Sequence, residues 1–215
     1  MLKITVIIGL VLLIWAHPSF GKSVEDYYKA GVRYLDKGKY AKAIRQFQKI
    51  LQERQDLPQI YNLMGVAYLR EGKSIESAVG SFQEAVRLDP HFTEGYYNLG
   101  VTYVGPGDNP SLAAQYFEKA IETNPDFFPA YLGLGWITLS INKDPEKAIL
   151  LFEKAIQCPE KKAEAYYGLG MAYATLGKKE MTLMPISMLR SMNRLDLSSI
   201  EESMIKEKPG QGDGS

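Results

Sequence analysis

Residues 96–103, YYNLGVTY, decide how the chain folds, because their spacing recurs along the whole sequence. Tyr96, Gly100 and Tyr103 lie at i, i+4 and i+7, the spacing of residues that share one face of a helix. Further along, Ala113 and Phe117 are four residues apart and form the stripe of a second helix. Because glycine has no side chain, the two helices can approach closely at Gly100. The stretch therefore predicts a pair of packed helices.

The two spacings recur every 34 or 35 residues, so the chain is predicted to contain several copies of one helical pair. The first register places glycine four residues after tyrosine, at Tyr27/Gly31, Tyr61/Gly65, Tyr96/Gly100, Tyr131/Gly135 and Tyr166/Gly170. The second register places phenylalanine four residues after alanine, at Ala43/Phe47, Ala78/Phe82, Ala113/Phe117 and Ala148/Phe152. No stretch shows the alternation typical of a strand.

Two dipeptides predict where second helices begin. Asn109-Pro110 and Asp144-Pro145 each place an N-cap residue before a proline at the first helical position.

These positions resemble the tetratricopeptide repeat, whose pattern is W-x2-L-G-x2-Y, then A-x3-F, then P over about 34 residues. The resemblance implies an all-α, right-handed superhelix, or α-solenoid, of helix-turn-helix repeats with a C-terminal capping helix. The expected repeat domain spans residues 22–206, with repeats at about 24–57, 58–91, 93–126, 128–161 and 163–196. The capping box Ser198-x-x-Glu201 predicts a cap helix at 198–206. Residues 207–215 are expected to be a disordered tail.

The last two repeats depart from the pattern. In the fourth repeat, Thr138 replaces the second aromatic residue of the first helix. The second helix of the fifth repeat lacks the alanine and phenylalanine stripe and contains Pro185. Because proline has no backbone N–H, Pro185 is expected to kink or break this helix.

The amino terminus has the layout of a secretory signal peptide, predicted at residues 1–21. Lys3 precedes an apolar run of 13 residues from Ile4 to Ala16, which is shorter than the roughly 20 residues of a spanning helix. Small residues, Ser19 and Gly21, precede a cut before Lys22. We therefore expect an exported, periplasmic or secreted protein. An uncleaved N-terminal membrane anchor is the alternative, and membrane contact is expected only in that case.

The composition argues against several classes of function. The balance of 25 Lys+Arg against 25 Asp+Glu lacks the basic excess that non-specific nucleic-acid binding requires, so no nucleic-acid partner is expected. One cysteine, Cys158, and two histidines leave too few ligands for a metal centre or a histidine-based triad. We therefore expect no catalytic residue, no metal, no cofactor and no enzyme activity.

The remaining candidate is the concave groove that the resemblance places on the other face of each first helix. Its residues are Tyr28, Asn62, Val66, Tyr97, Asn98, Val101, Leu132, Trp136, Tyr167 and Met171, none of which is charged. Such a surface suits an apolar or amphipathic peptide, whose backbone the amides can pair with. The expected function is a scaffold or adaptor that binds a protein or peptide segment in envelope or periplasmic complex assembly. The alternative is a self-associating structural module whose groove is internally occupied.

Overall fold

The computed structural model describes residues 23–105, 107–158 and 163–192, and these residues form ten helices and no strand. The helices are α2 (Val24–Asp36), α3 (Tyr40–Glu53), α4 (Pro58–Glu71), α5 (Ile75–Leu88), α6 (Thr93–Val104), α7 (Pro110–Thr123), α8 (Phe128–Ser140), α9 (Pro145–Gln157), α10 (Ala163–Thr175) and α11 (Lys179–Ser191). The expected all-α repeat solenoid is confirmed. The predicted signal peptide (1–21), cap helix (198–206) and tail (207–215) lie outside the described residues.

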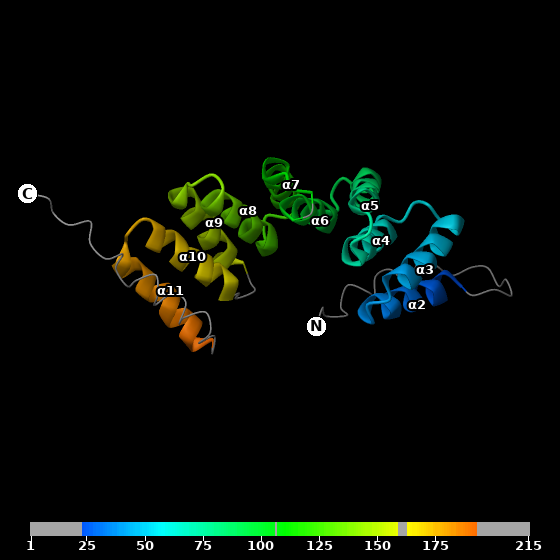
Figure 1. Cartoon of the computed structure of the whole chain (residues 1–215), viewed down its shortest axis with the longest axis horizontal. Helices are drawn as coiled ribbons and strands as arrows, with labels where there is room; N and C mark the ends of the chain where they lie inside the picture. Colours follow the sequence, from blue (N-terminus) through cyan, green and yellow to red (C-terminus); the bar gives the residue numbers. More distant parts are fainter. Residues whose placement is uncertain (1–22, 106, 159–162, 193–215) are drawn as a thin grey trace, which may run out of the picture.

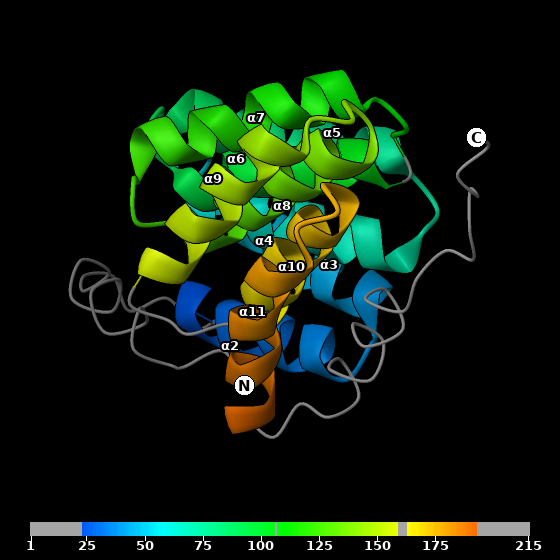
Figure 2. The ribbon, with the colours of Figure 1, turned by 90° about the vertical axis from the view of Figure 1, so that its left-hand side faces the viewer.

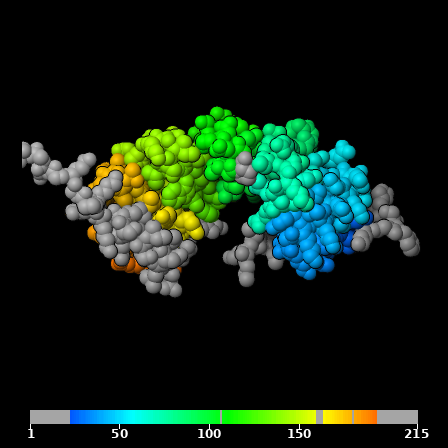
Figure 3. All heavy atoms as spheres, in the orientation of Figure 1, coloured from blue at the N-terminus to red at the C-terminus, as the bar shows by residue number. Residues whose placement is uncertain are grey.

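Consecutive helices pack as pairs, and the pairs follow one another in an arc (Figure 1). First helices of neighbouring repeats also contact one another, α4 with α6, α6 with α8, and α8 with α10. The second helices do not approach each other to the same extent. The row therefore curves with its first helices toward the inner side. Figure 2 looks along the row from the α10 and α11 end, and Figure 3 shows the arch hollowed on its lower side. None of the described helices has the length and apolar character of a membrane span.

The second helices α7 and α9 begin where the sequence predicts. The Asn109 side chain accepts a hydrogen bond from the Leu112 N–H at 3.1 Å, and the Asp144 side chain accepts one from the Lys147 N–H at 2.9 Å. Each bond satisfies a backbone donor that has no partner within its helix, so both predicted N-caps are confirmed.

The four phenylalanines of the repeat register form the centre of the core, where each ring lies directly on a glycine of its own repeat. Phe47, Phe82, Phe117 and Phe152 are fully buried. A Cβ atom added to Gly31, Gly65, Gly100 or Gly135 would lie only 2.5–2.7 Å from a ring carbon of its phenylalanine. No side chain fits at that distance, so the close approach of each helical pair requires the glycine.

A second set of glycines joins one repeat to the next. A Cβ atom at Gly133 would lie 2.7 Å from the ring of Phe117, which belongs to the preceding repeat, and one at Gly168 would overlap Phe152 in the same way. The rings of Phe117 and Phe152 are therefore held between two backbones. Gly133 and Gly168 are 35 residues apart, which is one repeat period, so this contact could have been predicted from the sequence.

The sequence predicts a kink or a break at Pro185; helix α11 continues through this residue, so the break is wrong. Thr182 and Ile186 are buried four residues apart, where the earlier repeats have alanine and phenylalanine. Pro185 is itself buried, and its ring packs in the interior. Because proline has no backbone N–H, the helical hydrogen bond to the Met181 carbonyl, four residues earlier, is lost. Burial of the apolar Pro185 ring is favourable and opposes the cost of the lost hydrogen bond.

Thr138 is buried, and within the described residues its hydroxyl has no hydrogen-bond partner. Replacing Thr138 with valine should therefore raise the free energy of unfolding by about 1 kcal/mol, because an unpaired buried hydroxyl is removed at nearly constant shape. Thr102 is the matched control, since it is equally buried but donates to the Asn98 carbonyl at 2.7 Å. Urea unfolding of both valine variants tests this, and a stability gain only for Thr102→Val would contradict it.

Candidate functional site

The ten residues predicted to line the groove all lie on first helices and are all half-buried. Tyr28 lies on α2, and the others are distributed over α4, α6, α8 and α10. The eight that are not asparagine pack against the hydrophobic core clusters of the repeats. Each of the ten therefore has one part fixed by packing and another part exposed to solvent.

Two of these residues form a polar contact between neighbouring repeats. The Asn98 Nδ2 group on α6 donates a hydrogen bond of 2.8 Å to Asn62 Oδ1 on α4. Asn98 Oδ1 and Asn62 Nδ2 make no hydrogen bond to other described residues. The pair thus retains Asn98 Oδ1 as an acceptor and the N–H groups of Asn62 Nδ2 as donors, which together can complement the N–H and C=O of a single peptide group. The sequence reasoning named both residues but missed their contact, although their separation of 36 residues is close to the repeat period.

Three aromatic residues of the set, Tyr97, Trp136 and Tyr167, are held by ring contacts. The Trp136 ring lies 5.7 Å from that of Tyr167, centroid to centroid, and 5.3 Å from that of Phe152. The Tyr97 ring meets Phe127 edge-on at 5.4 Å. Because these rings are fixed by their neighbours, a ligand that packs against them loses little free energy in ordering side chains.

Burial raises the pKa of Tyr97 and of Tyr28 above the ordinary tyrosine value. Both hydroxyl groups are therefore neutral at physiological pH and can donate hydrogen bonds. The candidate surface remains uncharged under those conditions.

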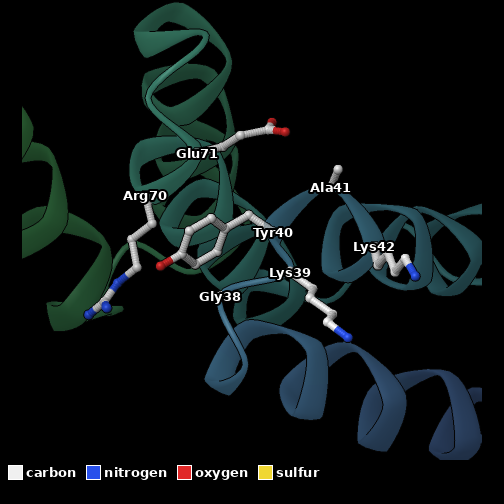
Figure 4. Close-up of a pocket in the computed structure, with 7 residues that line it drawn as sticks. All are labelled: Gly38, Lys39, Tyr40, Ala41, Lys42, Arg70 and Glu71. Carbon is white, nitrogen blue, oxygen red and sulfur yellow. The ribbon is translucent and has the colours of Figure 1, made fainter.

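Two shallow hollows on the described surface include none of the ten residues. The first, of about 390 Å³, lies between the α2–α3 turn and the end of α4 (Figure 4). In it the side chains of Tyr40 and Arg70 point toward each other, whereas Glu71 points away. The second, of about 380 Å³, lies mainly along α7. Neither hollow therefore forms part of the candidate groove.

The described residues offer no group of three or more histidine, cysteine, aspartate or glutamate side chains that could hold a metal ion. Cys158 is buried, and its thiol donates to the Lys154 carbonyl at 3.4 Å. Burial and the nearby Asp126 raise the pKa of this thiol, which keeps it protonated and poorly nucleophilic.

Three family models of tetratricopeptide repeats match segments of the chain that together make up more than half of it. The model described as TPR repeat matches residues 31–72, and two described as tetratricopeptide repeat match residues 116–149 and residues 93–127 with 163–181. The chain belongs to the tetratricopeptide repeat family. This TPR protein thus has the fold of a protein–protein interaction scaffold. Members of the TPR family generally act as non-catalytic interaction modules. No curated protein sequence matches the chain.

Several solved structures share the TPR fold. MamA protein superposes with a TM-score of 0.61 at 24% identity, covering 87% of this chain and 96% of MamA. TTC0263, a thermophilic TPR protein in Thermus thermophilus, gives 0.62 at 20% identity, covering 85% and 99%. YrrB, a TPR protein with an unusual peptide-binding site, gives 0.64 at 20% identity, covering 83% and 91%. At these identities the likeness establishes the fold.

Proposed function

We propose that this TPR protein is a non-catalytic adaptor that binds an extended peptide segment in its uncharged concave groove. The observation that supports it best is the pair formed by Asn62 and Asn98. An extended chain presents its N–H and C=O groups to the side, and the unpaired donor and acceptor of the two amides can bind both groups of one peptide unit. Recognition of this kind fixes the ligand backbone without requiring a particular side chain.

Affinity for particular side chains comes from the apolar residues beside the pair. Tyr97 precedes Asn98 on α6, and Val66 lies one turn beyond Asn62 on α4. Trp136 and Tyr167 extend the apolar surface over the following two repeats. Half-buried aromatic rings bind apolar side chains with little loss of their own freedom. The preferred ligand is therefore a segment with apolar residues, not an acidic tail.

We place this activity in the envelope or periplasm, in the assembly of protein complexes. The support is the sequence of residues 1–21, in which one lysine, an apolar run and two small residues precede Lys22. A peptidase-processed amino terminus at Lys22, found by mass spectrometry of the native protein, is the expected result.

The peptide proposal can be tested with segments enriched from a displayed random peptide library. Asn62→Ala combined with Asn98→Ala should weaken their binding about tenfold, because two hydrogen bonds of about 0.5–1 kcal/mol each are lost. Gln115→Ala is the matched control, since Gln115 has the same amide group on the exposed face of α7. Fluorescence anisotropy with labelled peptides measures both.

Equal affinities for the wild type and the asparagine variant would reject the proposed role of the pair. If no peptide is enriched and sedimentation equilibrium shows a stable dimer, the self-associating module is the better account.

A further inference from the structure

The exposed face of α3, the second helix of the first repeat, carries a row of cations. Lys42, Arg45 and Lys49 lie at i, i+3 and i+7, so they share one face of the helix over about 10 Å. All three side chains are exposed, and none has an ion pair with another described residue. The acidic residue of α3, Glu53, lies at its last position. The positive charge of the row is therefore not neutralised by the described part of the chain.

The packing of the repeat does not require these cations. The positions equivalent to Lys42, Arg45 and Lys49 hold Ser77, Gly80 and Glu84 in the second repeat, Leu112, Gln115 and Lys119 in the third, and Lys147, Leu150 and Lys154 in the fourth. In each of these repeats the second helix buries the same alanine and phenylalanine. Neutral, apolar and acidic residues thus serve equally well at these positions, so the complete row of three cations is not a packing feature.

Two of the lysines lie against α2 instead of extending freely into solvent. Lys42 Nζ lies 5.9 Å from the centroid of the Tyr34 ring, and Lys49 Nζ lies 5.1 Å from that of the Tyr27 ring. An aromatic ring attracts a cation but does not neutralise its charge. The two ammonium groups are therefore positioned by the rings and still lack a counterion, so binding an anion costs them less conformational freedom.

The row leads into the hollow at the amino-terminal end of α3 (Figure 4). Lys39, Lys42 and Arg70 line this hollow. The acidic residue that lines it, Glu71, points away and pairs with Lys73 at 2.9 Å. No side chain caps α3, and its first turn has no acidic residue. The first N–H groups of the helix therefore add to the positive charge on this side.

We propose that this basic face, formed by Lys39, Lys42, Arg45, Lys49 and Arg70, docks an acidic segment of a partner protein. Side chains one turn apart on a helix are separated by about 5–6 Å. Alternate side chains of an extended chain are separated by about 6.6 Å. Carboxylates at alternate positions of an extended segment can therefore pair in turn with the cations of the row, and the next carboxylate reaches the hollow.

The shape and charge of the surface favour a peptide segment over other anionic partners. A peptide can lie along α3 and place a carboxylate in the hollow, whereas a flat lipid surface cannot enter it. A second copy of the chain does not match the row, because no described helix carries three acidic residues on one face. In α7, for example, Lys119 lies between Glu118 and Glu122 and pairs with Glu122.

The basic face is separate from the candidate groove and contains none of its ten residues. Four of its five residues lie on α3 or on the turn before it, and Arg70 lies near the end of α4. The two surfaces can therefore be occupied at the same time, one by an apolar segment and the other by an acidic one. Asn62→Ala combined with Asn98→Ala should leave the binding of an acidic peptide unchanged, so this proposal can fail or stand independently of the proposed function.

Fluorescence anisotropy with the full chain and a labelled peptide of alternating glutamate and serine tests the proposal. Lys42→Gln combined with Lys49→Gln should weaken binding about fivefold at low ionic strength, because two charge pairs are lost. Lys147→Gln combined with Lys154→Gln is the matched control. These lysines occupy the same repeat positions on α9, are equally exposed and change the net charge by the same amount. The control should change the affinity by less than about twofold.

Two results with this peptide would overturn the proposal, namely equal weakening by the two double variants, or no binding to the wild type. Vesicles of phosphatidylcholine and phosphatidylglycerol test the lipid alternative, and the wild type and both variants should bind them alike. Vesicle binding lost only in the Lys42 and Lys49 variant would assign the face to lipid. A dimer in sedimentation equilibrium that only this variant loses would assign it to a second copy. Either outcome would overturn the proposal, and circular dichroism checks that the variants fold.

Discussion

Replacing Phe117 with alanine is expected to lower the free energy of unfolding by about 3–5 kcal/mol, as for large aromatic residues in other cores. The Phe117 ring fills the space between Gly100 of its own repeat and Gly133 of the next. Neither glycine has a side chain that could move into the cavity. The loss therefore affects two interfaces at once, the one within the third repeat and the one between the third and fourth repeats.

Urea unfolding followed by circular dichroism measures this loss, and hydrogen exchange locates it. Because each repeat contacts only its neighbours, we expect the two sides of the weakened interface to unfold at different urea concentrations. Tyr116→Ala is the control. This ring is adjacent on α7 but half-buried, and it stacks on Tyr103 at 5.7 Å. Equal losses of unfolding free energy for the two variants would show that a ring between two glycines contributes no more to stability than the neighbouring half-buried ring.

Replacing Gly100 with leucine is expected to cost about 1–3 kcal/mol through overpacking. A Cβ atom at Gly100 would already lie 2.6 Å from the Phe117 ring, before the rest of the leucine side chain is considered. The ring cannot move away freely, because Gly133 lies against it on the other side. The thermal midpoint should fall accordingly, and a midpoint equal to that of the wild type would remove the packing argument.

Gly80 provides the matched control for this substitution. It also lies inside a helix, α5, but a Cβ atom there would meet nothing within 4 Å. Gly80→Ala should stabilise the protein by about 0.5–1 kcal/mol, because alanine favours the helix and restricts the unfolded chain. Opposite signs at Gly80 and Gly100 would separate helix propensity from packing.

The repeat architecture could be predicted from sequence because it depends on contacts of fixed spacing. Gly100 and Phe117 are 17 residues apart, and the same separation recurs at Gly65 and Phe82 and at Gly135 and Phe152. Each pair lies within one helical hairpin, where the turn length determines which residues meet. The N-caps at Asn109 and Asp144 could also be predicted, because each side chain bonds to a backbone N–H only three residues further along the chain.

The sequence did not predict features that depend on residues outside the repeat pattern, or on how one repeat is placed against the next. Thr182 and Ile186 occupy the buried stripe of α11, but their residue types differ from the alanine and phenylalanine pattern. Pro185 was expected to kink or break the helix because it lacks a backbone N–H, and that expectation takes no account of the burial of its ring. The contact of Asn98 with Asn62 depends on how one repeat is rotated relative to the next, which the spacing within a hairpin does not determine.

Because of its position, Trp136 can serve as an intrinsic fluorescence probe. The sequence has two tryptophans, and the other, Trp15, lies in the apolar run near the amino terminus. A chain that begins at Lys22 therefore emits tryptophan fluorescence from a single site. That site contacts Tyr167 of the neighbouring repeat and is half-exposed on the candidate groove. A shift in the emission maximum would thus report ligand entry or separation of the fourth and fifth repeats without any added label.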